Sequence, residues 1–382
     1  YYMHQFSRKQ PDLNWENPNM RQELYNMINW WIDRGIEGFR LDVIDHIGKV
    51  PDEKIMVEGP KLHQLIHELF AITFCKSGLV SVGEAWSATP ERALLYSNPD
   101  GSELAMVFQF EHISLDQQPD GTKWDLMPLP FLRFKEVMNK WQTELHGRGW
   151  NSLFWDNHDL PRIVSRWGND SEEYRVISAK MLATLLHGME GTPYIYQGEE
   201  LGMTNTPLSI DQYNDLETLN AYRVLKADGR SEEDIMKSIH AKSRDNARTP
   251  MQWDDSAQAG FTTGTPWLPV NPNYTTINAA SQVNDDDSIF SYYKKLIRLR
   301  KETPVIADGS FQMLLPDDEA IFAYHRKDDS QTLTVICNFY GNTCKIDAAS
   351  LIPEGSQLLI SNYADMEDVN TLRPYEARMY LK

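Results

Sequence analysis

Short apolar segments alternate with helical segments along most of this chain, and this alternation limits the possible folds more than any other feature. The expected strands are residues 38–44, 78–84, 105–110, 152–155 and 193–196. Helical spacing of apolar residues marks residues 17–34, 59–73, 90–97, 131–145 and 172–189. Strands that are joined through helices lie parallel, with the helices outside the sheet. The sequence therefore predicts an α/β protein built around a parallel sheet.

The character of the chain changes after residue 302. A last helix is expected over residues 286–301, with three aspartates at its start and basic residues at its end, as suits a helix dipole. Residues 255–285 are rich in Gly, Pro, Asn and Thr and are expected to form a long structured loop. Beyond the helix, residues 321–325 and 333–337 resemble two strands around a polar turn. We expect two domains: residues 1–302 with the parallel sheet, and residues 303–382 as an antiparallel β sandwich.

The balance of charges narrows the class of ligand. Lys and Arg number 37 against 55 Asp and Glu, which gives a net charge of −18. Nucleic acids and anionic membrane surfaces are bound through clustered Lys and Arg, so neither is an expected partner. A small neutral or cationic molecule is the expected ligand.

The cysteines and the apolar runs indicate the compartment. Cys75, Cys337 and Cys344 are too few and too scattered for a disulfide framework, which favours a reducing environment. The sequence contains no apolar run of the ~18 residues that a membrane span needs. We therefore expect a cytoplasmic protein.

Acidic residues stand at the carboxyl ends of three expected strands. Arg40 and Asp42 would share one face of the first strand, because alternate residues of a strand point to the same side. Glu84 ends the second strand, and Asp159 follows the fourth. The carboxyl ends of parallel strands are where barrel enzymes hold their active sites. The sequence therefore predicts that these acids converge in a catalytic site, although a buried ion pair alone would explain Arg40 and Asp42.

Two carboxyl groups that face each other across a glycosidic bond can hydrolyse it. One group must be ionised to attack, and the other must be protonated to donate to the leaving oxygen. Arg40 would hold Asp42 ionised. The apolar neighbours of Glu84, Ala85 and Trp86, would raise the pKa of its carboxyl group, which suits a proton donor.

Seven motifs occur in order along nearly the whole chain. They are QPDLN at 10–14, GFRLDVI at 38–44, VGEA at 82–85, FWDNHD at 154–159, GTPYIYQGEE at 191–200, RDNARTPMQW at 244–253 and PWLPVNPNY at 266–274. In these motifs the chain resembles the α-amylase family of glycoside hydrolases, in its oligo-1,6-glucosidase branch. Trp86 and Leu160 make it most similar to the glucan 1,6-α-glucosidases, or dextran glucosidases, of that branch.

The resemblance implies catalytic roles for three acids. Asp42 would be the nucleophile that forms a covalent glucosyl-enzyme, and Glu84 would be the acid/base. Asp159 would bind the sugar hydroxyls as the ring flattens towards an oxocarbenium ion.

The resemblance also implies residues that bind the substrate. They are Arg40, Val43, Trp86, His158 and Arg244. Arg248, in the same motif as Arg244, is the alternative to it, and Val43 is expected between the cleaved glucose and the next sugar. Glu199 and Glu200 are interpreted as structural. No cofactor and no metal site are expected.

The resemblance begins part-way along the family's barrel. The five expected strands would be the fourth to eighth of a (β/α)₈ TIM barrel, which needs eight strand–helix units. The family's first motif, ending in Asn-His, is absent. We therefore expect a partial TIM barrel, strands 4–8, followed by a small antiparallel all-β domain, and an N-terminally incomplete sequence of a whole enzyme. A true fragment would leave a central strand unpaired.

The expected function is that of a retaining, exo-acting α-glucosidase that hydrolyses α-1,6 bonds of isomalto-oligosaccharides or dextran ends, as a monomer. A trehalose-6-phosphate hydrolase is the first alternative, although its phosphate would require a basic rim and no cluster of Lys or Arg stands near the motifs. A non-catalytic relative or an inactive fragment is the second. The presence of Asp42, Glu84 and Asp159 disfavours a non-catalytic relative, because such proteins lose these acids.

Overall fold

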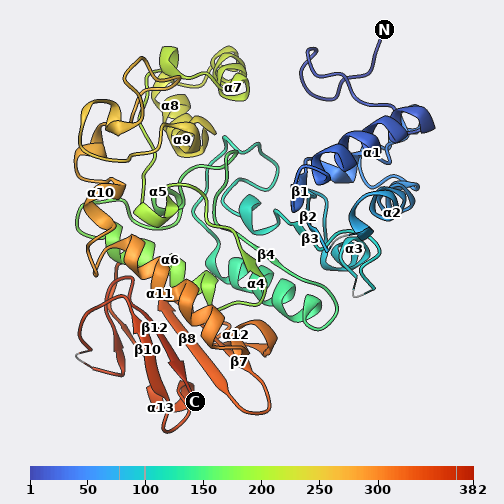
Figure 1. Cartoon of the computed structure of the whole chain (residues 1–382). Coiled ribbons are helices and arrows are strands. Elements are labelled where there is room, and N and C mark those ends of the chain that lie inside the picture. Colours follow the sequence, from blue (N-terminus) through green and yellow to red (C-terminus); the bar gives the residue numbers. More distant parts are fainter. Residues whose placement is uncertain (77, 99, 367) are drawn as a thin grey trace. The chain divides into compact units, whose positions relative to one another are not determined.

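The computed structural model describes residues 1–76, 78–98, 100–366 and 368–382. The chain divides into two compact units, Tyr1–Glu111 with Glu144–Ser152, and His112–Thr143 with Leu153–Lys382. The boundary expected from the sequence, at residue 302, lies inside the second unit. Figure 1 shows the elements of both units in the colours of the sequence.

The first unit is built around a parallel sheet of three strands with the order β1-β2-β3. Its strands are β1 (Gly38–Leu41), β2 (Val80–Glu84) and β3 (Met106–Phe108). Its helices are α1 (Pro18–Ile32), α2 (Leu62–Ile72) and α3 (Pro90–Tyr96). The alternation of strands and helices is confirmed here, although each strand is shorter than expected. Asn151, the residue before β4, bridges Val107 of β3 in parallel.

Local sequence sets the ends of these elements. The side chain of Asn17 accepts a hydrogen bond from the N–H of Asn19 at the start of α1, and Pro18 occupies the first helical position, where its missing N–H costs nothing. Gly83 of β2 leaves no room for a side chain, because a Cβ atom there would stand 2.8 Å from methyl carbons of Ile44 and Leu104. This close packing fixes the position of the neighbouring Glu84.

The second unit continues the same pattern of short strands and helices. Strand β4 (Ser152–Leu153) pairs with β5 (Thr192–Pro193), and the N–H of Tyr194 donates to the carbonyl of Leu153. The longer helices near them are α4 (Phe131–Leu145), α6 (Arg175–His187) and α11 (Ile289–Glu302). Every residue of α6 from 178 to 187 is buried, because α6 packs against α11 and against the C-terminal sheet, as Figure 1 shows. A helix covered on all sides needs no polar face.

The C-terminal part of the second unit is an antiparallel sheet of five strands with the order β10-β12-β8-β7-β6. The strands are β6 (Ser310–Leu314), β7 (Ile321–Lys327), β8 (Thr332–Asn338), β10 (Gln357–Ser361) and β12 (Ala377–Leu381). A separate pair joins β9 (Cys344–Lys345) to β11 (Thr371–Leu372). The expected hairpin of residues 321–325 and 333–337 is confirmed as β7 and β8.

Two helices that the sequence analysis did not predict pack against each other and share a core with Trp124, Leu208 and Tyr213. They are α7 (Leu216–Ala227) and α8 (Glu232–Lys242), and the short α9 (Asp245–Arg248) follows them. The side chains of Asp215 and Ser231 cap α7 and α8 through the N–H groups of Thr218 and Asp234. The remaining short helices are α5 (Ile163–Arg166), α10 (Ala279–Gln282), α12 (Val305–Asp308) and α13 (Ala348–Leu351).

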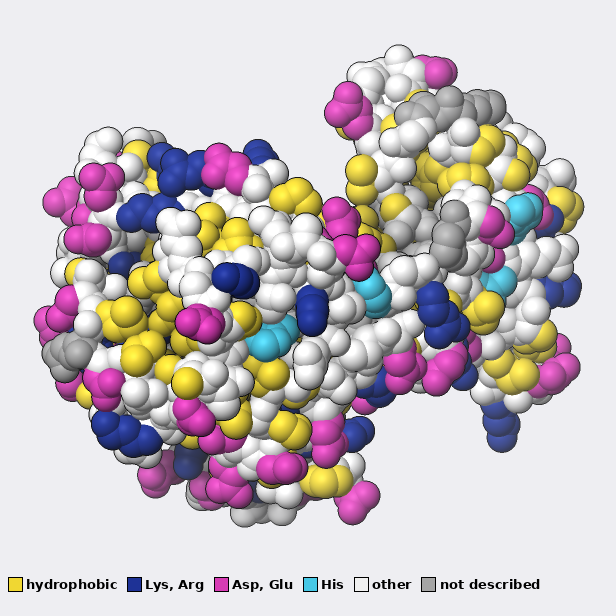
Figure 2. All heavy atoms as spheres, turned by 90° about the horizontal axis from the view of Figure 1, so that it is seen from below, with side chains coloured by type: hydrophobic (Ala, Val, Ile, Leu, Met, Phe, Trp, Pro, Cys, Tyr) yellow, Lys and Arg dark blue, Asp and Glu magenta, His cyan; other side chains and the backbone are white. Residues whose placement is uncertain are grey.

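The surface carries both signs of charge. Acidic and basic side chains are interspersed on the face that Figure 2 shows. Among the helices in the described ranges, none combines the length and the apolar character that crossing a membrane requires.

Candidate active site

Arg40 connects the two acids of the first unit. Its Nη1 lies 2.7 Å from Oδ1 of Asp42, and its Nη2 lies 2.8 Å from Oε2 of Glu84. The side chain of Asp42 is 64% exposed, whereas that of Glu84 is only 5% exposed. The guanidinium group therefore holds one accessible and one buried carboxyl group next to each other.

Val43, two residues after the end of β1, has an unusual backbone conformation. The sequence analysis continued the first strand to residue 44, but β1 ends at Leu41, because Val43 adopts φ 40° and ψ 47°. These angles are left-handed and cost free energy, above all for a β-branched residue. The turn directs the N–H of Val43 to Oε2 of Glu84, at 3.2 Å. The strained backbone thus contributes a donor to the site.

Trp86 covers the buried carboxyl group. Its Nε1–H donates to Oε1 of Glu84 at 2.9 Å, and its ring stacks on Phe110 with centroids 3.9 Å apart and planes 9° apart. Trp86 is 47% exposed, so the outer part of its ring is free to contact a ligand. Phe110 was not singled out from the sequence, and the one available signal was its place at the end of the third expected strand.

Burial is the main cause of a raised pKa at Glu84. A hydrogen-bond contact with Asp42 raises the pKa further, whereas the donors Trp86, Arg40 and the N–H of Val43 lower it. The net direction is upward. Glu84 therefore retains its proton to higher pH than an ordinary glutamate, as a proton donor requires.

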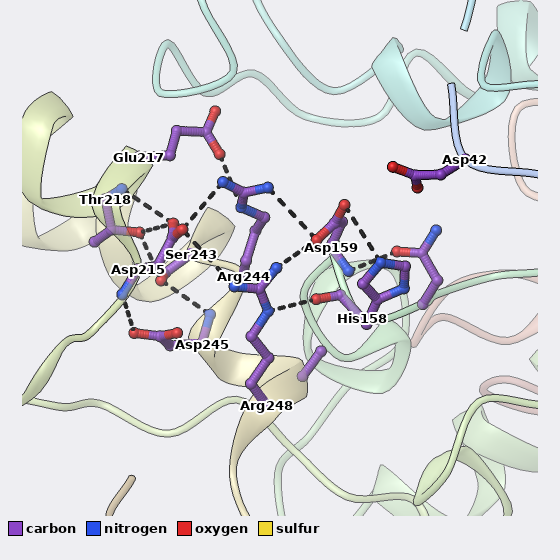
Figure 3. A network of polar contacts seen from close by, with 12 residues as sticks. Asp42, His158, Asp159, Asp215, Glu217, Thr218, Ser243, Arg244, Asp245 and Arg248 are labelled. Carbon is purple, nitrogen blue, oxygen red and sulfur yellow. Dashed lines mark hydrogen bonds and ion pairs between the residues drawn. The ribbon is translucent and has the colours of Figure 1, made fainter. Parts of the chain in front are cut away.

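His158 and Asp159 follow β4 in the second unit. The N–H of Asp159 donates to Oδ1 of Asn157 at 2.7 Å, which closes a tight turn. Nε2 of His158 lies 3.6 Å from Oδ2 of Asp159. The turn presents both side chains from the same short loop, shown in Figure 3.

Arg244, the N-cap of α9, and Arg248, the last residue of α9, both reach Asp159. Nη2 of Arg248 lies 2.5 Å from Oδ1 of Asp159, whereas Nη1 of Arg244 lies 3.5 Å from the same atom. Arg244 is held more closely by Asp215 and Glu217, each at 3.1 Å. Figure 3 shows Arg244 between Asp159 and these two acids. The structure therefore places both candidate arginines beside Asp159, with Arg248 in the closer contact.

Asp215 and Glu217 are members of this network that the sequence analysis missed. Asp215 is the N-cap of α7. An aspartate directly before a helical segment is a sequence signal for a helix start, and this signal would have predicted both α7 and the role of Asp215 as its cap. Burial opposes ionisation of Asp215, but the hydroxyl group of Thr218 and the charge of Arg244 outweigh burial and lower its pKa. Asp215 is thus an anion that holds Arg244 in place.

A cavity of about 670 Å³ opens in the second unit beside these arginines. Its lining consists of Tyr196, Gln197, Asn214, Asp215, Leu216, Arg244, Asp245, Arg248, Trp267 and Leu268. The Nε1–H of Trp267 donates to the carbonyl of Arg248 at 2.8 Å. The cavity is large enough for a small ligand and combines charged groups with an aromatic face.

The residues expected from the sequence form two connected groups. Arg40, Asp42, Val43, Glu84 and Trp86 lie together in the first unit. His158, Asp159 and Arg244 lie together in the second, with Arg248. Within the described ranges, no group of three or more His, Cys, Asp and Glu side chains is placed to hold a metal ion.

A family model and two curated relatives match this chain over most of its length. Residues 1–309 match the family model described as the alpha amylase catalytic domain. An oligo-1,6-glucosidase of Halalkalibacterium halodurans is 52% identical over 402 residues, covering 100% of this chain and 71% of that protein. A glucan 1,6-alpha-glucosidase of Streptococcus pneumoniae is 52% identical over 384 residues, covering 99% of this chain and 70% of that protein.

A solved structure is similar over the same extent. The crystal structure of the trehalose-6-phosphate hydrolase of Bacillus licheniformis superposes with a TM-score of 0.94 at 46% identity. The match covers 100% of this chain and 71% of that one.

Proposed function

This chain belongs to the α-amylase family of glycoside hydrolases, and we propose that it is a retaining, exo-acting α-glucosidase for α-1,6 bonds at the ends of isomalto-oligosaccharides or dextran. The observation that carries the proposal is the arrangement around Arg40, which places an exposed carboxylate, Asp42, beside a buried carboxyl group with a raised pKa, Glu84. This is the division of roles that a double displacement requires.

The family fold is a TIM barrel followed by an antiparallel β-sheet domain. We propose that β1 to β5 are the fourth to eighth strands of that barrel, with residues 1–302 as the catalytic domain and 303–382 as a β sandwich. The order of acids along β1, β2 and the loop after β4 supports this assignment, since each stands at the carboxyl end of a strand.

The proposed reaction has two steps. Asp42 attacks the anomeric carbon of the terminal glucose while Glu84 donates its proton to the departing oxygen, which leaves a covalent glucosyl ester on Asp42. The ionised Glu84 then takes a proton from water, whose oxygen attacks the anomeric carbon and frees Asp42. Asp159, His158 and either Arg244 or Arg248 bind the ring hydroxyls.

A neutral sugar fits the charges of the second group better than a phosphorylated one. The cations in and beside this group are already paired with carboxylates, since Lys123 and Arg244 contact Glu217, and Arg248 contacts Asp159 and Asp215. A phosphate would need cations that are not neutralised in this way. One relative of known structure is nevertheless a trehalose-6-phosphate hydrolase, so the substrate in that name is the necessary comparison.

The decisive experiment is the release of glucose from isomaltose, maltose and trehalose 6-phosphate, with the anomer of the first product read by NMR. We expect isomaltose to have the highest kcat/KM and the glucose freed from its non-reducing end to be the α anomer, seen as an initial excess of α-glucose over the equilibrium mixture that the reducing end supplies. Preference for trehalose 6-phosphate would replace the proposal by the alternative, and an initial excess of β-glucose over that mixture would contradict retention. No turnover of any of the three would favour a non-catalytic member.

Val43 is the proposed gate for linkage. An α-1,6 link adds a carbon and a rotatable bond, so it carries the second sugar along a different path from an α-1,4 link. The side chain of Val43 is stiff at χ1, because it is branched at Cβ, and can block one path while leaving the other open. Val43→Ala is expected to raise hydrolysis of maltose relative to isomaltose by roughly 10- to 200-fold in kcat/KM, the range for one or two methyl groups in a pocket.

The matched control is Val43→Ile, which keeps the branch at Cβ. The ratio of the two activities in this variant is expected to stay near that of the wild type or to favour isomaltose further. Val43 is not the gate if the alanine variant folds with a normal melting curve and shows an unchanged ratio.

Trp86 is expected to set the pH range of activity through Glu84. Its indole N–H stabilises the ionised form of Glu84, so Trp86→Phe removes an effect that lowers the pKa while burial continues to raise it. Loss of activity at alkaline pH reports ionisation of the proton donor. The alkaline limb of kcat/KM should therefore move to higher pH in Trp86→Phe.

Trp30→Phe is the control, because Trp30 is an exposed tryptophan of the same unit that packs against Trp31 and Arg34. Its pH profile should match that of the wild type. A limb that stays in place or moves to lower pH in Trp86→Phe would show that the indole N–H does not tune the proton donor.

A further inference from the structure

Two buried acids that the proposed reaction does not use stand next to each other in the second unit. Asp156 follows β4 and is 2% exposed, and Glu199 follows β5 and is 4% exposed. Their carboxyl groups are hydrogen-bond neighbours. Two ionised carboxylates have no hydrogen to share, so such a contact requires a proton on one of them.

The other hydrogen bonds of the two groups leave one position for that proton. Oδ2 of Asp156 accepts from the N–H of Ile163 at 3.1 Å, and Oε1 of Glu199 accepts from the hydroxyl of Tyr293 at 2.6 Å. The N–H of Tyr196 reaches Oε2 of Glu199 at 3.4 Å. Oδ1 of Asp156 is buried and meets no N–H or hydroxyl donor among the described residues. A proton on Glu199 would give this atom its missing hydrogen bond.

The charges around the pair lead to the same requirement. Arg162, 1% exposed, is the cation whose charge acts on both acids, and Arg166, which also acts on Asp156, is engaged by Asp116 at 2.6 Å. Two ionised acids with one guanidinium would leave a net negative charge in the interior, and one shared proton cancels it. The remaining ionisable neighbours are Glu200, Tyr196 and Tyr293, none of which supplies a positive charge. Burial and the charge of Asp156 raise the pKa of Glu199 well above its usual value.

The pair lies at the base of the loop that carries His158 and Asp159. The bond from Ile163 to Asp156 closes this loop at its two ends. Arg162, at the end of the loop, donates to the carbonyl oxygens of Asn246 and Ala247 at 3.2 Å each. Those carbonyls belong to α9, which ends at Arg248. Displacement of Asp156 would therefore move Asp159 and α9 together.

We propose that Asp156 and Glu199 hold one proton between their carboxyl groups, and that this protonated pair positions Asp159 and the α9 turn. The positioning role rests on the proposed function of Asp159, whereas the sharing of the proton does not.

The proposal fixes the sign of a pH effect on folding. In the unfolded chain both acids lose their protons near the usual carboxyl pKa values, whereas the native pair keeps one proton to higher pH. The native state then binds one proton more than the unfolded state, so the folding equilibrium constant falls by up to about tenfold per pH unit in that window.

Amide variants remove the need for the proton without removing the hydrogen bonds. In Asp156→Asn, the side-chain oxygen still accepts from Ile163, and the amide donates to an ionised Glu199. In Glu199→Gln, the amide donates to an ionised Asp156, and its oxygen still accepts from Tyr293. Asp156→Ala removes the loop closure as well, and Asp170→Asn is the control at an exposed aspartate of the same unit.

Infrared spectroscopy and denaturant unfolding between pH 5 and 9 test the proton. We expect the wild type and Asp170→Asn to show a protonated-carboxyl stretch in addition to that of Glu84, and we expect this additional stretch to be absent from the spectra of Asp156→Asn and Glu199→Gln. The pH slope of stability should be shallower by one proton in both amide variants than in the wild type. A wild-type spectrum without this stretch, or amide variants that keep it together with the slope, would overturn the shared proton.

Kinetics on isomaltose test the positioning role. Asp156→Ala is expected to lose about 100-fold in kcat/KM, as a displacement near 1 Å in a catalytic group does, and Asp156→Asn is expected to restore most of it. Full activity in a folded Asp156→Ala protein would refute the positioning role. A wild type that turns over no glucoside would defeat the proposed function alone, because the infrared and unfolding measurements need no substrate.

Discussion

Replacing Asp42 by Asn should abolish turnover of every α-glucoside while leaving the fold intact. The side chain of Asp42 is exposed, so the amide is accommodated without burying a new group. It cannot attack the anomeric carbon, and losses of roughly 10⁴- to 10⁶-fold in kcat are typical when a covalent catalyst is removed. Glucose release from isomaltose and from a nitrophenyl α-glucoside measures the effect.

The control for this substitution is Asp52→Asn, which makes the same chemical change at an exposed aspartate of the first unit. Its activity should equal that of the wild type. A residual activity of Asp42→Asn above a few per cent on either substrate would show that another group attacks the sugar. Trapping of a glucosyl ester on the peptide that contains Asp42, detected by mass spectrometry in the wild type, would support the covalent step independently.

Glu84→Gln should produce a loss that depends on the leaving group. A general acid contributes typically 10²- to 10⁴-fold, and that contribution is needed most when the departing oxygen is strongly basic. Formation of the intermediate from isomaltose should therefore slow by roughly 10²- to 10⁴-fold, whereas nitrophenolate leaves with little assistance. The first-turnover burst of nitrophenol isolates this step from the later hydrolysis, which also uses Glu84.

The comparison of the two substrates separates catalysis from misfolding, because a damaged site would slow both by the same factor. Equal losses for isomaltose and the nitrophenyl glucoside in the rate of forming the intermediate would refute the acid role of Glu84. Arg40 loses its contact with the carboxyl group of Glu84 in this variant, so the melting temperature should be measured alongside, with Glu91→Gln as a control at an exposed glutamate of the same unit.

The repeated strand–helix pattern made the parallel strands and their helices predictable, because each short apolar run had to be covered by a helix. The ends of the elements were less predictable. Nothing in the letters of residues 38–44 shows that Val43 leaves the strand, since valine strongly favours an extended backbone. The left-handed turn there is imposed by its surroundings.

The partners of the proposed catalytic residues were harder to infer than the residues themselves. Asp42 and Glu84 stand in local motifs, but Phe110 and Asp215 reach their positions through contacts distant in sequence. Asp215 belongs to α7, a helix that the spacing of its apolar residues did not reveal, although Asp215 itself is a residue type that commonly caps a helix. The contact between Asp156 and Glu199 spans two strand ends and had no signal beyond the acidic letters.

The C-terminal sheet covers one side of α6, and this bears on how such proteins recombine. The hydroxyl of Tyr324 donates to the carbonyl of Leu185 at 2.8 Å, and Arg326 pairs with Glu190 at 2.9 Å in the interior. Cutting the chain at residue 302 would expose the apolar surface of α6 and would leave the buried Glu190 without its partner Arg326. Exchange of C-terminal parts between relatives should therefore succeed only when the incoming sheet carries a matching tyrosine and arginine, so inheritance of this sheet is tied to that of α6.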